Sequence, residues 1–154
     1  MRTVDRVPVP APLERVYAAA AAVERWPEIL PHYRWVRRVD GNLVEMAAWR
    51  PFGPLKYPVW WVSEMALDRP AGAIHYRHVR GITRGMRVTW RLVEVDGGGV
   101  DVEIVHTWDG PAWPLIGRLA ADLVIGPVFI HGVASRTLAG IKIAVEGRNG
   151  GASS

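Results

Sequence analysis

The sequence of 154 residues contains no cysteine, which excludes disulfides, thiolate nucleophiles and zinc or iron–sulfur sites that depend on cysteine. It contains no run of about 18 apolar residues, so no transmembrane helix is expected. The first ten residues, MRTVDRVPVP, have no apolar stretch of the kind that a signal peptide needs. We therefore expect a cytoplasmic protein.

Lysine is scarce, at Lys56 and Lys142 only, so the net charge of +4 comes from arginine. The densest group of arginines is Arg34, Arg37 and Arg38. Nucleic-acid binding normally requires a concentrated basic patch or stripe. The spread of charge therefore predicts no nucleic-acid partner, and it leaves open a weak contact with anionic membrane surfaces.

Motifs for a metal, a nucleotide or a serine nucleophile are also missing. His75 and His78 stand three apart in a predicted strand, so they point to opposite faces of a sheet. The glycines at 97–99 lie between two strands, whereas a phosphate-binding loop opens a helix. A catalytic triad built on Ser63 would need a strained turn, and Ser63 lies within a strand. We expect no metal and no cofactor.

With 49% hydrophobic and 22% charged residues, the composition is that of a soluble globular protein. The length suits one domain with a sizeable core. We expect a single domain over residues 1–148 and a disordered tail over 149–154.

Hydrophobic periodicity and turn residues predict a strand, two short helices, six strands and a long C-terminal helix. Consecutive strands are expected to pair antiparallel, helped by turns such as Asp40-Gly41. The predicted strands are Arg2–Val9, Tyr33–Val39, Leu43–Arg50, Tyr57–Leu67, Ile74–Arg80, Met86–Val95 and Val100–Trp108, with a loop at Pro51–Leu55. The predicted helices are Leu13–Val23, a short one from Pro27 to near Pro31, a helical piece Leu115–Ile125, and Val128–Glu146.

The strand Tyr57–Leu67, with the sequence YPVWWVSEMAL, has two different faces. Because successive strand residues alternate in direction, one face is uncharged and the other carries Glu64. The uncharged face consists of Tyr57, Val59, Trp61, Ser63, Met65 and Leu67. It suits either the wall of a pocket with a few polar groups, or a core strand that tolerates a serine.

The same alternation predicts which side chains of the other strands point inward. Trp61, Trp90 and Trp108 converge from three strands, as a pocket lining or as simple packing. The inward sets are Ile74, Tyr76, His78 and Arg80; Met86, Val88, Trp90 and Leu92; Val100, Val102, Ile104, His106 and Trp108; and Val44, Met46, Ala48 and Arg50.

The order of elements resembles the helix-grip fold of the START-like (SRPBCC) superfamily. The opening VPVPAPLERVYAAAAAVERWPEILPHY resembles the start of its polyketide cyclase/dehydrase group, and the WVS at residues 61–63 resembles a strand of aromatase/cyclases. The resemblance covers about residues 3–148. It implies an α+β fold in which a curved antiparallel sheet of about seven strands surrounds a long C-terminal helix, with a ligand cavity between them.

The resemblance also implies which residues face that cavity. The expected ligand-binding residues are Trp26, Trp61, Ser63, Met65, Tyr76, Met86, Trp90, Ile104 and Trp108. In aromatase/cyclases an arginine, treated as catalytic, lies two residues after the serine of the WVS. Met65 occupies that position here. Arg50 or Arg80 can replace it only if a strand-end arginine turns inward and does not extend into solvent.

Tyr33, His78 and His106 are the candidate catalytic residues. A histidine titrates near neutral pH and can transfer a proton. For each residue a structural role is an alternative: a loop cap for Tyr33, an exposed edge histidine for His78 and a core histidine for His106. His131 is expected to be exposed.

We therefore predict binding of a hydrophobic, polycyclic or polyketide-like small molecule. The alternatives are a polyketide aromatase/cyclase or dehydratase, and a Coq10-like quinone or lipid carrier. Such ligands need a pocket of more than about 300 Å³, and a core filled by side chains would contradict both binding and cyclisation. A monomer and a homodimer are both compatible with the sequence.

Overall fold

The computed structural model describes residues 1–52, 54–110 and 127–147. At residues 51, 52 and 127–134 it describes the backbone only. The predicted helical piece Leu115–Ile125 and the predicted tail 149–154 lie outside the described residues. The side chain of His131, which was expected to be exposed, is not described either.

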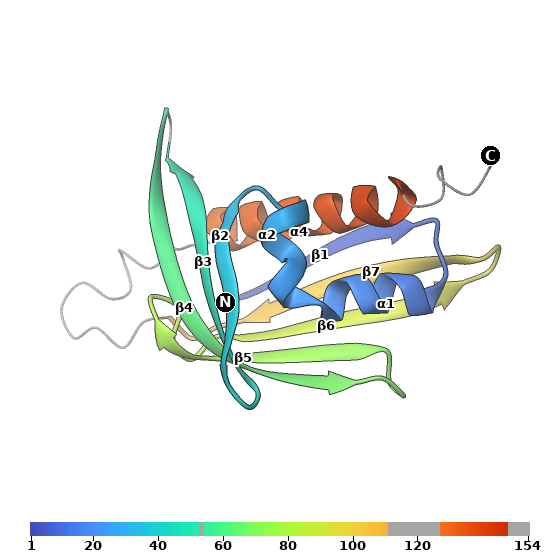
Figure 1. Cartoon of the computed structure of the whole chain (residues 1–154), viewed down its shortest axis with the longest axis horizontal. Helices are drawn as coiled ribbons and strands as arrows, with labels where there is room; N and C mark the ends of the chain where they lie inside the picture. The colour runs from blue at the N-terminus through green and yellow to red at the C-terminus, as the bar shows by residue number, and fades with distance from the viewer. Residues whose placement is uncertain (53, 111–126, 148–154) are drawn as a thin grey trace.

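Seven strands form one antiparallel sheet in the order β1-β7-β6-β5-β4-β3-β2. The sheet curves around the C-terminal helix (Figure 1), so the predicted helix-grip fold is confirmed. The strands are β1 (Arg2–Val9), β2 (Tyr33–Asp40), β3 (Leu43–Phe52), β4 (Leu55–Asp68), β5 (Ala73–Gly81), β6 (Arg87–Val95) and β7 (Gly99–Thr107).

The first helices cross the sheet because β1 and β2 form its two opposite edges. The connection runs through α1 (Leu13–Ala21), the 3₁₀ turn η1 (Val23–Arg25) and α2 (Trp26–Ile29). Two buried aromatic residues fix this connection. The Tyr17 hydroxyl donates to the carbonyl oxygen of Ala73 at 2.9 Å, and Trp26 Nε1 donates to the carbonyl oxygen of Ala19 at 3.2 Å.

The long helix α4 (Pro127–Gly147) lies on the same face of the sheet as α1 and α2 (Figure 1). Leu138, Ile141 and Val145 follow each other at helical spacing, and all three are buried. A Cβ atom at Gly140 would overlap the side chain of Leu30, so this glycine lets α4 approach the segment after α2. The predicted helix is therefore confirmed, one residue longer at each end.

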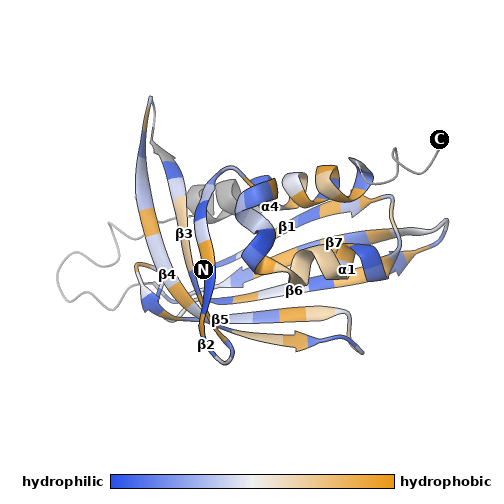
Figure 2. Cartoon of the chain, viewed as in Figure 1, coloured by the Kyte–Doolittle hydropathy of each residue, from blue (hydrophilic) through white to orange (hydrophobic). Residues whose placement is uncertain are grey.

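Apolar and polar residues alternate along the strands (Figure 2), and the apolar set faces the helices. On β4 the residues Val59, Trp61, Ser63 and Met65 are buried, as predicted. Leu67 was expected on the same face, but it is 53% exposed because it lies at the end of the strand beside a turn.

The hairpin β3–β4 is longer than predicted, since the expected loop Pro51–Leu55 is mostly strand. The pairing of the two strands continues to Phe52 and Leu55. Pro58 is tolerated within β4 because the pairing with β5 ends at Trp61, which leaves Pro58 on an unpaired edge. The first two helices also differ slightly from expectation. Helix α1 ends at Ala21, and α2 begins at Trp26.

Gly81 pairs with Trp61, and the register of β4 and β5 shifts close by, between Val62 and Ser63. Its φ is +94°, and a Cβ atom there would lie 2.7 Å from Trp61 Cα and even closer to the carbonyl oxygen of Trp60. Only glycine fits this conformation and this approach. Beyond the shift, Ser63 pairs with His78, so two inward polar residues lie opposite each other.

We expect Gly81→Ala to lower the free energy of unfolding by about 3 kcal/mol, because it adds a backbone clash to an unfavourable φ. Gly97→Ala is the matched control, with φ of +100° and nothing within 4 Å of the added Cβ. It should cost only about 1 kcal/mol. Urea unfolding of both variants measures the difference, and equal losses would contradict the role of close approach.

Candidate functional site

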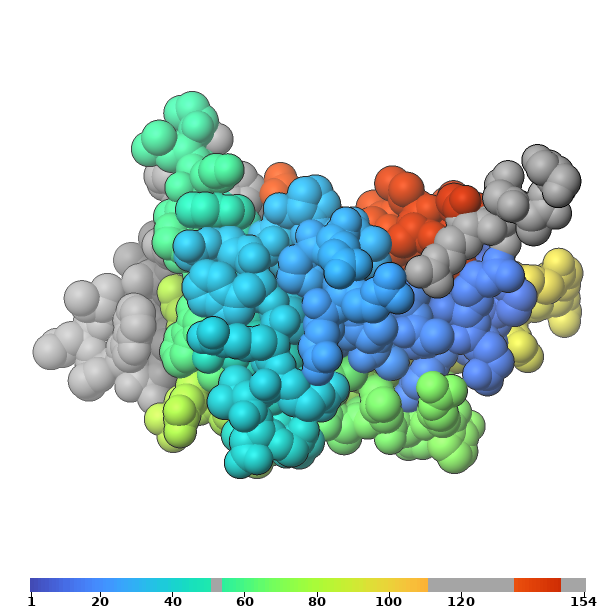
Figure 3. All heavy atoms as spheres, viewed as in Figure 1, coloured from blue at the N-terminus to red at the C-terminus, as the bar shows by residue number. Residues whose placement is uncertain are grey.

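An inner cavity of about 70 Å³ lies inside the fold, between the sheet, α2 and α4. This volume holds a few water molecules and is far below the 300 Å³ that we expected. The face shown in Figure 3 is covered by atoms of α1, α2 and β2. The cavity is lined by Trp26, Tyr33, Met46, Trp61, Ser63, Tyr76, His78, Thr83, Met86, Val88, Trp90, Ile104, His106 and Thr137.

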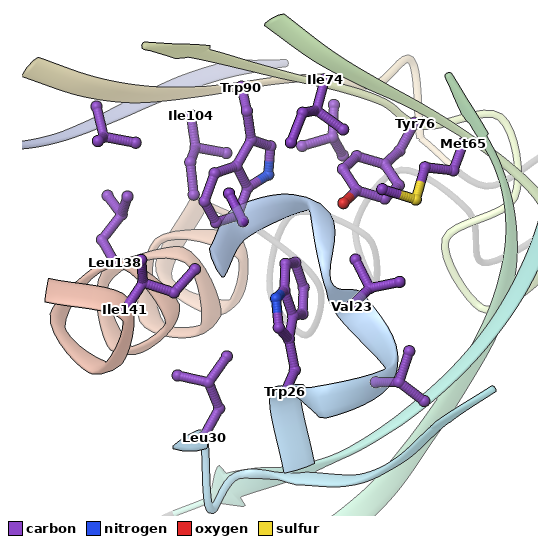
Figure 4. Close-up of a cluster of buried hydrophobic side chains, with 14 of the residues drawn as sticks. Val23, Trp26, Leu30, Met65, Ile74, Tyr76, Trp90, Ile104, Leu138 and Ile141 are labelled. Carbon is purple, nitrogen blue, oxygen red and sulfur yellow. The ribbon is translucent and has the colours of Figure 1, made fainter. Parts of the chain in front are cut away.

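Trp26 occupies the centre of this inner space. It extends from α2 towards Trp90 on the sheet, and Leu138 and Ile141 of α4 lie beside them (Figure 4). The ring of Trp26 is 5.6 Å from that of Trp90 and 5.4 Å from that of Tyr33, measured between centroids. These contacts make one part of the cavity wall aromatic, which suits flat apolar molecules.

His78 is buried, which contradicts the alternative of an exposed edge histidine. Its ring stacks on Trp61, with centroids 5.8 Å apart, and its Nδ1 lies 2.6 Å from the Thr83 hydroxyl. Burial and the nearby His106 lower the pKa of His78 to about 3. At neutral pH its imidazole is therefore uncharged.

Three buried polar atoms of the cavity residues have no hydrogen-bond partner among the described residues. They are Ser63 Oγ, Tyr76 Oη and His106 Nδ1, which come from β4, β5 and β7. Buried polar groups in native proteins almost always have a partner. Unpartnered atoms that line a cavity are therefore available to a bound molecule or to water.

The cavity is electrically neutral at pH 7. Burial lowers the pKa of His106 to about 4, raises that of Tyr33 to about 12 and raises that of Tyr76 well above its ordinary value. No arginine is among its described lining residues, because Arg80 is exposed and Arg50 lies against the ring of Tyr57. Neither arginine takes the place of the one expected at Met65.

Most of the predicted site residues come together around the cavity. Trp26, Tyr33, Trp61, Ser63, Tyr76, His78, Met86, Trp90, Ile104 and His106 all line it. Met65 and Trp108 are buried but do not line it. Met65 packs beside Tyr76 (Figure 4), and Trp108 Nε1 donates to the carbonyl oxygen of Arg84 at 3.0 Å.

Two threonines of the lining were missed by sequence analysis. Thr137 lies four residues before Ile141, so helical spacing already placed it near the buried stripe of α4. Thr83 had no comparable signal, because it lies in the turn between β5 and β6 and reaches His78 only through the fold.

The arginine group at 34, 37 and 38 is largely neutralised. Arg37 pairs with Glu45 at 2.7 Å, and Arg38 pairs with Glu24 at 2.9 Å. In the described parts of the chain, no helix is long and apolar enough to cross a membrane. The same residues contain no group of three histidine or acidic side chains that could hold a metal ion.

The buried histidines predict a loss of stability in acid. Their folded pKa values lie below the ordinary 6.5, so the unfolded state binds more protons between pH 6.5 and about 4. The contribution of these histidines to the free energy of unfolding is therefore fully present above pH 6.5 and is lost as the pH decreases. We expect His78 to account for about 2 kcal/mol of the free energy of unfolding that is lost between pH 7 and pH 5.

Denaturant unfolding at several pH values tests this expectation. His78→Asn keeps a polar atom near Thr83 but cannot become charged. The free energy of unfolding of this variant should therefore depend less steeply on pH. The matched control is His75→Asn, an exposed histidine on the other face of the same strand, and it should leave the dependence unchanged. The opposite ranking of the two variants would contradict the assignment.

Comparison with solved structures shows the same fold in other proteins. TTHA0849 from Thermus thermophilus is 21% identical with a TM-score of 0.75, over 96% of this chain and 99% of that chain. The Zhui aromatase/cyclase from Streptomyces sp. R1128 is 18% identical with a TM-score of 0.76, over 96% and 94%. The di-domain aromatase/cyclase BexL from the BE-7585A biosynthetic pathway is 24% identical with a TM-score of 0.69, over 95% and 46%.

At these identities the likeness establishes the fold alone. Among curated proteins, none matches the sequence. Residues 9–125 match the family described as polyketide cyclase/dehydrase and lipid transport, which is more than half of the chain. The chain therefore belongs to the polyketide cyclase/dehydrase and lipid transport family.

Proposed function

We propose that this protein binds a flat, hydrophobic small molecule that carries a few oxygen atoms, of the polyketide-like or polycyclic kind. The observation that carries the proposal is the set of unpartnered polar atoms of Ser63, Tyr76 and His106 in an aromatic cavity. Hydroxyl or keto oxygens of a ligand would complete their hydrogen bonds. The apolar rings of the same ligand would stack on the tryptophans.

The small volume of the cavity requires that the ligand displaces part of its wall. A three-ring molecule cannot enter about 70 Å³, so binding must separate the sheet from the helices that cover it. Trp26 is the side chain best placed to move, because α2 has only four residues and Trp26 lies between α2 and the sheet. Its rotation would add the volume of an indole ring to the space.

Neutral side chains favour binding over chemistry at this site. A general acid or base works best when its pKa lies near the working pH. The pKa values of about 3 for His78, 4 for His106 and 12 for Tyr33 lie far from neutrality. Neutral imidazoles and phenols still donate and accept hydrogen bonds, which is what an uncharged oxygenated ligand needs.

Two variants test the proposed binding. Tyr76→Phe and Ser63→Ala remove unpartnered groups, so the free energy of unfolding should stay the same or rise by up to about 1 kcal/mol. Affinity for 1,8-dihydroxyanthraquinone, measured by quenching of tryptophan fluorescence, should fall about tenfold. Anthracene, which has the same shape without oxygens, should bind both variants and the parent protein alike.

Tyr17→Phe is the matched control, since the Tyr17 hydroxyl is also buried but already has a partner. It should lower the free energy of unfolding by about 1 kcal/mol and leave anthraquinone affinity unchanged. The proposal would be wrong if Tyr76→Phe and Tyr17→Phe had the same effects, or if the parent protein bound neither ring system.

An aromatase/cyclase or dehydratase is the second candidate, favoured by the meeting of several proton-bearing groups. Ser63 faces His78 across β4 and β5, and Tyr33 and His106 line the same cavity. In that case the cavity would bend a poly-β-ketone chain and thereby position its reacting atoms.

Cyclisation of a polyketide substrate by the parent protein, Tyr33→Phe and His106→Ala separates the two candidates. If these side chains transfer protons, turnover should fall about a hundredfold in each variant while substrate affinity changes much less. Turnover that stays unchanged in both variants would remove these groups from any proton transfer. Absence of turnover in the parent protein, together with anthraquinone binding, would leave binding as the function.

A further inference from the structure

A second hollow, larger than the cavity, lies on the outer side of the fold. This outer groove lies between α4, the segment that follows α2, and the outer part of the hairpin β3–β4, and its volume is about 660 Å³. Sites for small molecules usually have volumes of about 300–1,000 Å³. The outer groove thus has the size that the inner cavity lacks.

The floor and one wall of the outer groove are apolar. On this side of α4 the lining residues Ala139, Gly140 and Ala144 have small side chains or none. Ile143 beside them is 70% exposed. Trp49 of β3 forms the opposite wall. An exposed isoleucine that faces a tryptophan across small residues provides room for a ring or a short chain.

The rim of the outer groove is positively charged. Lys56 and Arg136 line it, and neither has an ion pair with an acidic side chain among the described residues. Lys56 Nζ lies 4.8 Å from the centre of the Trp49 ring, and Arg34 Cζ lies 4.7 Å from it. None of the described residues that line the groove is acidic.

This pattern differs from the outer face of the sheet, where arginines pair with glutamates. Arg77 pairs with Glu64 at 2.6 Å, and Arg91 pairs with Glu103 at 3.3 Å. Lys56 and Arg136 lie instead beside an apolar surface, with no acidic partner in the described ranges. Such a site attracts an anion, and salt screens the attraction.

The groove and the cavity are linked by a hydrogen-bonded pair of side chains. His32 lines the groove and Thr137 lines the cavity, and His32 Nε2 lies 3.1 Å from the Thr137 hydroxyl oxygen. Burial, and to a smaller extent the positive charge of Arg136, lowers the pKa of His32 to about 4. The charge of Arg136 therefore acts electrostatically on His32, at the boundary between the two spaces.

We infer that the outer groove is a binding site for a small amphipathic anion. Its ring or chain lies against Trp49 and Ile143, and its carboxylate or phosphate is held by Lys56 and Arg136. The site is separate from the cavity and does not depend on the proposed function. Through this site the protein would bind an anionic group, in addition to the neutral groups that the cavity can bind.

Calorimetric titration with 2-naphthoate and 2-naphthyl phosphate tests the site, because these probes carry the two anionic groups on one ring system. We expect both to bind the parent protein, more weakly at high salt. Lys56→Gln and Arg136→Gln should each reduce the affinity about tenfold. The neutral probe 2-methoxynaphthalene should bind both variants with the same affinity as the parent protein. A larger loss for one anion identifies which of the two groups the site prefers.

Lys142→Gln is the matched control, since it removes one positive charge from α4 outside the groove. It should leave the affinity unchanged, and so should the cavity variant Tyr76→Phe, which keeps this result separate from the test of the cavity. Equal loss in Lys142→Gln and Arg136→Gln would overturn the inference. Binding to vesicles of phosphatidylglycerol without binding of either free anion would overturn it too, and would assign the surface to a membrane.

Discussion

The contact between Trp26 and Trp90 is the interaction on which the rest of the structure depends. Trp26 comes from a helix of four residues, and Trp90 comes from the middle of the sheet. Because the chain must cross from β1 at one edge to β2 at the other, α1 and α2 have to lie over the sheet. The Trp26–Trp90 contact fixes the height of that crossing and thereby the volume of the space beneath it.

The fold was predictable because its signals are local. Alternation along the strands and glycine-containing turns such as Asp40-Gly41 gave all seven strands, and helical spacing gave α4. The predictions failed where distant residues decide the outcome. A loop was expected at Pro51–Leu55, but β3 and β4 stay paired as far as Phe52 and Leu55, which the local sequence did not reveal.

The candidate site was predictable in part for the same reason. The inward direction of Trp61, Ser63 and His106 follows from alternation within each strand, and the structure places all three at the cavity. Direction does not determine depth, however. Met65 and Trp108 are also buried, but neither is among the residues that line the cavity. The volume of the cavity depends on how Trp26 packs, which no single strand encodes.

The inner cavity and the outer groove differ in the electrostatic conditions that they offer. In the cavity, desolvation keeps His78, His106 and Tyr33 neutral, so a charged ligand group would lose its hydration without gaining an opposite charge. In the outer groove, Lys56 and Arg136 are exposed, and neither forms an ion pair with an acidic side chain in the part of the chain that the structure describes. The cavity therefore favours a neutral ligand, whereas the outer groove favours an anionic one.

The boundary between the two spaces consists of side-chain contacts between α4 and the segment that follows α2. It includes the hydrogen bond between His32 and Thr137, the contact between the rings of His32 and Tyr33 with centroids 4.7 Å apart, and the packing of Leu30 against Gly140. A single hydrogen bond between neutral groups contributes only about 1 kcal/mol to stability, since water replaces it on opening. Trp26, four residues before Leu30 along the chain, belongs to the same short segment. Movement of this segment would open the boundary and enlarge the cavity together, so access and volume are governed by the same few contacts.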